Sequence, residues 1–193
     1  MKDILVQLDA GHGIETRGKR SPKWPDGSQL FEYQYNRQLV RLINLGLLKY
    51  KIKTAILVPE ISDIPLYIRV KRSNVLTAKN NSVLISVHGN AGGGTGMEVW
   101  TSPGQTKSDA LAQIWYTVAK KNMESIWPIR QDTSDGDADK ESKFYILANT
   151  ACPAILTENG FMDTAEDCMN MMDPYVQQII ADVHVQSILE YIK

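Results

Sequence analysis

The sequence has no excess of charge of either sign. Its 193 residues contain 21 lysines and arginines against 22 aspartates and glutamates, which gives a net charge of -1 at pH 7. Proteins that hold nucleic acid through its phosphates need a basic surface. We therefore expect no nucleic-acid partner.

Long hydrophobic runs are also missing. Apolar runs such as residues 83–87 are far shorter than the ~20 residues that a membrane-spanning helix requires, so we expect no membrane span. Polar residues interrupt the first nine positions, where a secretory signal would need an apolar stretch of ~7 to 15 residues. We expect either a protein that stays in the cytoplasm until it acts or a secreted mature domain without its leader.

Cysteine and histidine are scarce. Cys152 and Cys168 are the only cysteines, and they have no C-x-x-C spacing. This excludes a disulfide framework and a cysteine-rich zinc cluster. Any histidine chemistry must be built from His12, His88 and His184.

What the sequence does contain is an alternation of two patterns. Apolar runs that predict strands occur at residues 4–8, 54–58, 83–87, 97–100, 144–147 and 154–157. Amphipathic stretches that predict helices occur at residues 32–50, 66–79, 108–123 and 174–192. Several strands are apolar on both faces, as in a parallel sheet with helices on both sides. Residues 129–143 are acidic and predict an exposed loop.

The chain is suited to one closed hydrophobic core. Its length is that of one ordinary domain, and 43% of its residues are hydrophobic. No repeat or linker divides it. We therefore predict a single α/β domain over residues 1–193, built on a mostly parallel, twisted sheet of about six strands with helices on both faces.

Three polar side chains follow predicted strands. His12 lies between two glycines after the first strand, His88 follows residues 83–87, and Glu158 follows residues 154–157. The carboxyl ends of parallel strands meet at one edge of a sheet, where ligands bind. We therefore expect these three residues to be neighbours in space although they are distant in the sequence.

A fourth polar residue, Glu32, is placed by the periodicity of the predicted helix at residues 32–50. Glu32 falls on the same helical stripe as Tyr35, Leu39 and Ile43, so it heads the face that turns towards the core. Burying an unpaired carboxylate is costly, so such a residue needs a cation or several donors. Taken alone, Glu32 is better explained as a solvated residue of the first turn, where it favours the positive end of the helix dipole.

Two histidines and one glutamate are a ligand set of catalytic zinc, which keeps a fourth position for water. His12, Glu32 and His88 are therefore candidate zinc ligands, and Glu158 is the candidate for a carboxylate that moves protons. Each histidine taken separately fits ordinary hydrogen bonding in a loop. Their joint placement favours the metal site.

These residues belong to an ordered series of motifs that spans nearly the whole chain. The motifs are residues 8–13, Glu32 with Asn36, Arg69 ahead of Asn74, residues 86–91, residues 96–99 and residues 153–161. The series resembles the zinc-dependent N-acetylmuramoyl-L-alanine amidases of the type 3 amidase domain. It is similar in particular to the amidase domains of phage endolysins and autolysins.

The resemblance implies a hydrolase of peptidoglycan that cuts between the lactyl group of N-acetylmuramic acid and L-alanine. It implies one zinc ion per chain, held by His12, Glu32 and His88, with Glu158 as the catalytic carboxylate. Residues 1–193 would then be a single catalytic amidase domain that acts on the bacterial cell wall, and we expect it to be a monomer.

The resemblance also suggests residues that surround the cleft. Asn90 and the backbone near Gly96 would contact the substrate. Asp9 would either orient His12 or serve as a turn residue at the end of its strand. Trp24, in the long first loop, is a candidate for lining a sugar cleft.

Two alternatives to a zinc enzyme stay open. One is a peptidoglycan-binding module of the same fold without catalysis, and the other is an amidase or peptidase that uses Cys152 with a histidine. Thr157 and Asn159 flank Glu158 where the family more usually has valine and a small residue, but no ligand is lost. His184 has no assigned role and fits a packing or surface position.

Overall fold

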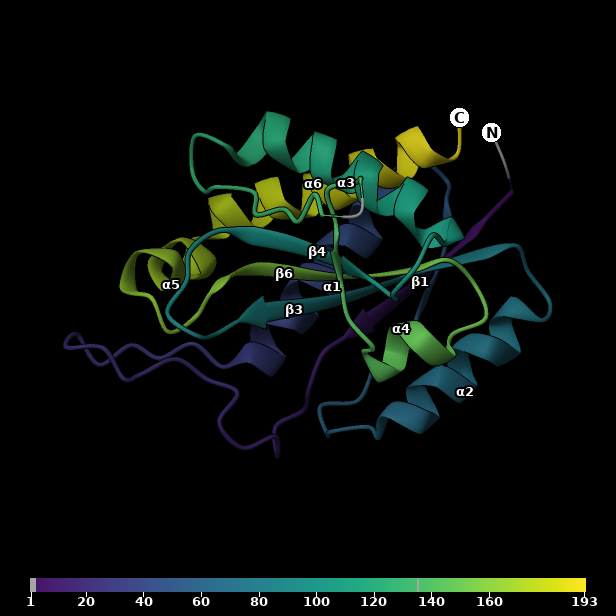
Figure 1. Ribbon diagram of the computed structural model, residues 1–193. Coiled ribbons are helices and arrows are strands. Elements are labelled where there is room, and N and C mark those ends of the chain that lie inside the picture. The colour runs from purple at the N-terminus through teal and green to yellow at the C-terminus, as the bar shows by residue number, and fades with distance from the viewer. Residues whose placement is uncertain (1–2, 135) are drawn as a thin grey trace.

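A six-stranded sheet runs through the centre of the computed structural model, which describes residues 3–134 and 136–193 (Figure 1). Met1 and Lys2, at the segment considered for a secretory signal, and Asp135, in the acidic loop, lie outside the described residues. The strands are β1 (Leu5–Ala10), β2 (Lys53–Ile56), β3 (Ser82–Asn90), β4 (Met97–Thr101), β5 (Lys140–Glu141) and β6 (Ala154–Phe161). The helices are α1 (Glu32–Lys49), α2 (Leu66–Thr77), α3 (Lys107–Met123), α4 (Tyr145–Asn149), α5 (Ala165–Met172) and α6 (Pro174–Tyr191).

The order of the strands across the sheet is β2-β1-β3-β6-β4-β5. β2, β1, β3 and β6 run parallel to one another, whereas β4 is antiparallel to β6 and parallel to β5. The prediction of an α/β fold with a mostly parallel six-stranded sheet is confirmed.

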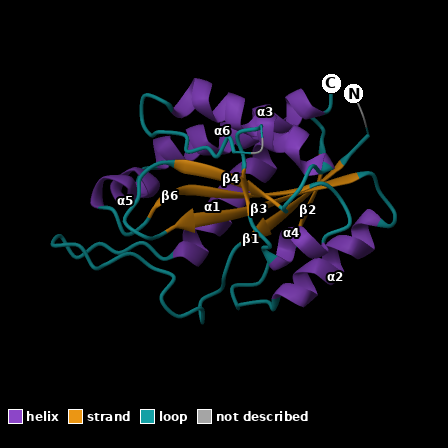
Figure 2. Cartoon of the chain, in the orientation of Figure 1, coloured by secondary structure: helices purple, strands orange, loops and turns teal. Residues whose placement is uncertain are grey.

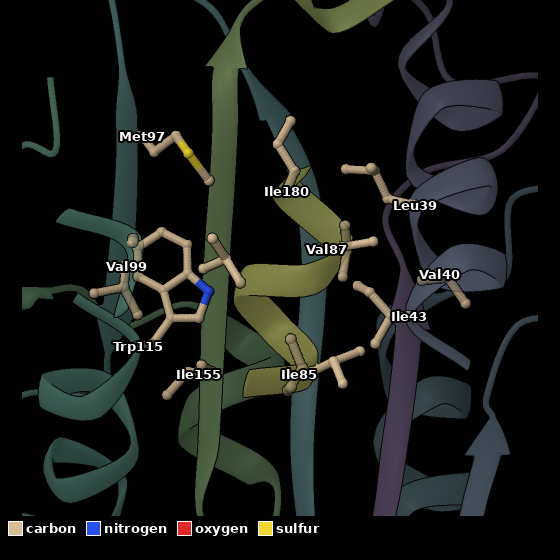
Figure 3. Close-up of a cluster of buried hydrophobic side chains, with 14 of the residues drawn as sticks. Leu39, Val40, Ile43, Ile85, Val87, Met97, Val99, Trp115, Ile155 and Ile180 are labelled. Atoms are coloured by element: carbon tan, nitrogen blue, oxygen red, sulfur yellow. The ribbon is translucent and has the colours of Figure 1, made fainter. Parts of the chain in front are cut away.

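The two faces of the sheet are covered unequally. Helices α1, α3 and α6 pack on one face, where side chains such as Ile85 and Trp115 form the main core (Figure 3). Helices α2 and α4 lie on the other side of the sheet from α3 and α6 (Figures 1 and 2), over a smaller cluster that includes Leu84. On this second face, His88 and Glu158 remain partly exposed near the carboxyl ends of β3 and β6.

Local structure differs from the prediction at three places. Residues 144–147 were predicted as a strand, but they begin the short helix α4, in which Ile146 and Leu147 are buried. A run of four apolar residues fits a buried helical turn as well as a strand, so periodicity cannot separate the two. The acidic loop contains the two-residue strand β5 and buries Ala138 and Asp139, so it is not exposed throughout. Helix α5 was not predicted.

The ends of the long helices follow from local sequence. The Asp173 side chain accepts a hydrogen bond from the Tyr175 amide, and Pro174 occupies the first position of α6. Thr106 and Asp109 form a reciprocal capping box at the start of α3. Across the described residues, none of the helices is both long and apolar enough to span a membrane.

His184 connects α6 to the sheet. Its Nδ1 atom donates to the Ile180 carbonyl at 2.8 Å, and its Nε2 atom lies 3.0 Å from the Thr157 hydroxyl on β6. The ring is completely buried, and this burial lowers its pKa to about 4. His184 is therefore a neutral residue of the core, on the face of the sheet opposite Glu158.

Candidate metal centre

His12, Glu32 and His88 come together at the carboxyl-terminal edge of the sheet. The Oε1 atom of Glu32 lies 3.3 Å from Nε2 of His12 and 3.2 Å from Nδ1 of His88. One candidate ligand atom from each side chain lies within 4.8 Å of the other two. Within the described ranges, this is the only group of three or more such side chains that could hold a metal ion.

His12 is held in an unusual backbone conformation. It follows β1 with a φ of 60°, in the left-handed region that residues other than glycine rarely adopt. Its carbonyl oxygen accepts hydrogen bonds from Nη1 of Arg37 at 3.0 Å and Nη2 of Arg69 at 3.4 Å. Two guanidinium groups therefore fix the backbone from which the imidazole projects.

The glycines beside His12 allow the loop to approach its neighbours. A Cβ atom on Gly11 would lie 2.1 Å from Cε1 of His88. A Cβ atom on Gly13 would lie 2.1 Å from the backbone nitrogen of Asp63. Any side chain at either position would push the two histidines or their loops apart.

Glu32 heads α1 and is completely buried, so it is not the solvated first-turn residue that its position alone favoured. Its Oε1 atom also accepts from the Asn36 side-chain amide and the Gly89 backbone amide, each at 3.3 Å. Its Oε2 atom is buried without a hydrogen-bond partner in the described chain, and Nζ of Lys19 lies 3.6 Å away. This buried oxygen thus has only the partly exposed Lys19 ammonium as an ion-pair partner and can still accept a metal ion.

Burial and mutual charge set the protonation of this group. Burial lowers the pKa of His12 to about 4. Burial would raise the pKa of Glu32, but its hydrogen bond with His88 and the nearby charges lower that pKa to about 2. Burial also opposes a charge on His88, yet the hydrogen bond with Glu32 and the charge of Glu158 raise its pKa above the ordinary value. The ionised glutamate and the neutral His12 are forms that bind metal.

Glu158 lies beside His88 on the neighbouring strand, at the same position of the parallel register. Both strands continue past these residues, with an irregularity between His88 and Asn90, whereas the sequence predicted that the strands end before them. The Oε2 atom of Glu158 is buried and has no partner within the described residues. Burial raises the pKa of Glu158 to about 7. A divalent cation nearby would lower this pKa because it stabilises the carboxylate.

The two candidate substrate contacts differ in their surroundings. Asn90 is half-buried at the end of β3, and its side-chain amide donates to Oε2 of Glu98 at 3.2 Å. Gly96 is buried, and its N–H donates to Oδ2 of Asp167 at 2.9 Å. That N–H is therefore not free to bind a substrate.

Other residues singled out in the sequence have structural contacts. Asp9 accepts from Nη1 of Arg69 at 3.0 Å and from the Ser86 hydroxyl at 2.7 Å, so it acts on the His12 loop through Arg69. The indole N–H of Trp24 donates to Sγ of Cys168 at 3.2 Å, and Trp24 packs against the main core. Cys152 is buried just before β6 begins, at the end of that strand away from Glu158.

A cavity of about 370 Å³ opens beside the two histidines. Its walls away from the centre include Ile64 and Leu66, near the start of α2, and Ile146 of α4. This volume lies within the range of sites for small ligands, roughly 300 to 1,000 Å³.

Sequence reasoning assigned no role to several polar residues around the centre. Glu98 lies on β4 directly opposite Glu158, and it is 2% exposed. Asn159 donates from its side-chain amide to the His88 carbonyl at 3.0 Å, which fastens β6 to β3 next to a candidate ligand. A charged residue inside the apolar run 97–100 was a signal for Glu98. Arg37 carried no such signal, because exposed arginines are common on helices.

Comparison with known proteins settles the family. The family model described as N-acetylmuramoyl-L-alanine amidase matches residues 6–190. The chain belongs to this family. Its members are N-acetylmuramoyl-L-alanine amidases, which are hydrolases, and the resemblance inferred from the sequence motifs is therefore confirmed.

Curated relatives agree with the family. The N-acetylmuramoyl-L-alanine amidase CwlM of Bacillus licheniformis is 26% identical over 185 residues, which cover 96% of this chain and 67% of that protein. The endolysin of Bacillus phage SPP1 is 27% identical over 195 residues, which cover 96% of this chain and 65% of that protein. The chain thus spans about two thirds of the length of these relatives.

Solved structures share the fold. The N-acetylmuramoyl-L-alanine amidase from Clostridium difficile 630 is 26% identical with a TM-score of 0.81, and the match covers 97% of this chain and 95% of that one. The catalytic domain of CwlV from Bacillus (Paenibacillus) polymyxa var. colistinus is 22% identical with a TM-score of 0.77, covering 98% of this chain and 99% of that one.

Proposed function

We propose that the protein is a zinc-dependent hydrolase that cuts peptidoglycan between the lactyl group of N-acetylmuramic acid and L-alanine. His12, Glu32 and His88 hold one zinc ion per chain, and Glu158 transfers the protons. The substrate places the site of action at the bacterial cell wall. The observation that carries this proposal is the convergence of three ligand atoms within 4.8 Å, beside a further carboxylate that is not one of them.

The donor set fits zinc. Two imidazoles and one carboxylate are a known catalytic zinc set, and the buried Oε2 atom of Glu32 has no hydrogen-bond partner elsewhere in the described chain. Zinc bound there would lower the pKa of a water molecule and polarise the carbonyl group of the substrate.

Glu158 is suited to carry a proton in both directions. Its carboxylate accepts a proton from the attacking water and then donates it to the alanine nitrogen as the amide bond breaks. Asn159 and the strand pairing with β3 hold this residue at a fixed position relative to His88. Burial excludes bulk water from part of the carboxylate, so the proton is retained for the leaving group.

The first test is Glu158→Gln, measured as free L-alanine amino ends released from purified cell walls. The variant keeps the size of the side chain but cannot accept the proton, so we expect a rate at least ~10²-fold lower. Elemental analysis should still find about one zinc ion per chain. Cys152→Ala is the matched control and should retain full activity, because burial raises the pKa of that thiol.

Three results would contradict the zinc mechanism. They are release that survives exhaustive chelation, release that survives Glu158→Gln, and release that is lost in Cys152→Ala. Retained affinity of the unmodified protein for cell walls without any cleavage would instead indicate a binding module of the same fold.

A further inference from the structure

Charged side chains form a row across the open face of the sheet. His88 on β3, Glu158 on β6 and Glu98 on β4 occupy facing positions of neighbouring strands. Glu98 is as deeply buried as a core residue, although it lies one strand from the centre. Its surroundings therefore bear on what the proposed active site can bind.

Glu98 is saturated with donors. Its Oε1 atom accepts from Nε of Arg130 at 2.5 Å and from Nζ of Lys140 at 2.9 Å. Its Oε2 atom accepts from the side chains of Asn90 at 3.2 Å and Trp100 at 3.1 Å. One carboxylate thus faces two cations.

The two cations are positioned rather than free to move. The Arg130 guanidinium lies 5.4 Å from the centre of the Phe161 ring, and the Lys140 ammonium lies 4.8 Å from the Trp100 ring. Their side chains are nevertheless 42% and 22% exposed, respectively. Arg130 reaches Glu98 through Nε, and its two terminal amino groups have no acceptor within the described residues.

We propose that Arg130, assisted by Lys140, binds a carboxylate of the stem peptide of the substrate. A guanidinium presents parallel donors that match the two oxygens of a carboxylate. Glu98 and the two aromatic rings hold that guanidinium before the substrate arrives, which reduces the entropy lost on binding. This inference rests on the proposed peptidoglycan substrate and adds a specificity-determining contact to it.

Distance indicates which part of the stem peptide reaches Arg130. The Arg130 backbone N–H donates to the Met97 carbonyl on β4. The Arg130 backbone therefore lies beside β4, on the side away from β6, at a distance of two strand spacings from β6. Neighbouring strands are about 4.8 Å apart, so the Arg130 backbone lies roughly 10 Å from Glu158, and its guanidinium, which contacts Glu98, lies about 5 to 10 Å from Glu158. An extended peptide advances about 3.3 to 3.6 Å per residue. The carboxylate therefore belongs to the second or third residue of the stem.

The side of the centre towards α2 and α4 is lined differently from the side towards β4. On the side of α2 and α4, the cavity beside His12 and His88 has apolar walls from Ile64, Leu66 and Ile146, and it is also lined by the charged side chains of Asp9, Asp63 and Arg69. In this lining Arg69 is buried and the exposed charge is the Asp63 carboxylate, so an uncharged sugar fits this side better than an anionic peptide does. The asymmetry thus predicts one direction of binding, with the glycan over α2 and the peptide over β4.

The test measures binding, not turnover. It uses zinc-loaded Glu158→Gln protein and N-acetylmuramoyl-tripeptides in which the carboxylates of the second and third residues are amidated one at a time. Isothermal titration should show that amidation of one of these two weakens binding about 10-fold. In the double variant Glu158→Gln with Arg130→Gln, the ligand with the free carboxylate and the ligand with the amidated one should bind with equal affinity.

Two further variants control for misfolding and for a general effect of removing a positive charge. Arg130→Lys keeps the charge beside Glu98, so the protein should fold, but it lacks the paired donors and should retain only part of the discrimination. Arg41→Gln removes the same charge from the exposed face of α1 and should change nothing.

The inference is overturned if Arg130→Gln weakens all the ligands by the same factor, if it weakens none, or if no ligand binds. Failure of the proposed function gives a different result. An enzyme that discriminates carboxylate from amide through Arg130 but releases no alanine amino ends would uphold the binding site and reject the hydrolysis.

Discussion

At the scale of single residues, the centre depends on a histidine whose backbone is strained. A non-glycine residue in the left-handed region costs about 1 to 3 kcal/mol and persists where surrounding contacts fix it. For His12 these contacts are the hydrogen bonds from Arg37 and Arg69 to its carbonyl oxygen. Arg37 also donates from Nε and Nη2 to the Glu60 carbonyl, so it joins α1 to two loops.

Arg37→Ala should therefore weaken zinc binding without touching a ligand. We expect a loss of about 10-fold in affinity, at the lower end of the effect of residues that orient metal ligands. Competition with a chromophoric chelator measures it. Arg41→Ala, one turn further along α1 on its exposed surface, is the control. Equal affinities of the two variants would show that Arg37 does not position His12.

The sequence located His12, Glu32 and His88 because each stands at a recognisable place, either after an apolar run or at the head of an amphipathic helix. The supporting residues could not be located in this way. Arg37 finds its acceptors in loops that are not its neighbours along the chain, and a hydrogen bond to a backbone carbonyl leaves no trace in residue type.

At the scale of elements, prediction succeeded where the hydrophobic period extends over many residues. Helices α1 and α6 are long enough for their apolar stripe to identify them. β5 has two residues and α4 has five, so both depend on the neighbours that they contact. Helix α5 carries a buried aspartate, Asp167, which accepts from the Gly96 and Phe161 amides and breaks the apolar pattern.

The contact between α6 and β6 makes stability depend on pH. His184 has a pKa of about 4 in the folded protein and an ordinary value near 6.5 when unfolded. Between these values the unfolded chain binds the extra proton, so stability falls as the pH drops from 6.5 towards 4, by up to roughly 3 kcal/mol.

Urea unfolding of the wild type and of His184→Gln, at pH 7 and pH 5, isolates this contribution. The glutamine variant does not titrate at this position and should lose less stability between the two pH values. An equal loss in both proteins would contradict a neutral buried His184.

At the scale of the whole molecule, a zinc ion bound as proposed would join three segments of the first half of the chain: the loop after β1, the start of α1 and the end of β3. A ligand that binds only the folded state stabilises it by about 2.7 kcal/mol at a hundred times its dissociation constant. For a chain of this length that corresponds to a rise of about 5 to 10 °C in Tm.

Differential scanning calorimetry with and without zinc tests this prediction. Glu158→Gln should keep the rise in Tm, because Glu158 is not a proposed ligand. Glu32→Ala should lose it. A rise of the same size in Glu32→Ala would place the ion elsewhere.

The strand order also bears on when the protein can become active. β6 is the last strand of the chain, yet it lies inside the sheet between β3 and β4. Pairing of segments so distant in sequence is slow, because the entropy of loop closure is lost before any contact forms. Glu158 lies on β6 and His88 on β3, so the pairing of β6 with β3 also completes the proposed catalytic site. A chain in which β6 has not yet paired with β3 therefore lacks the proposed catalytic carboxylate beside His88.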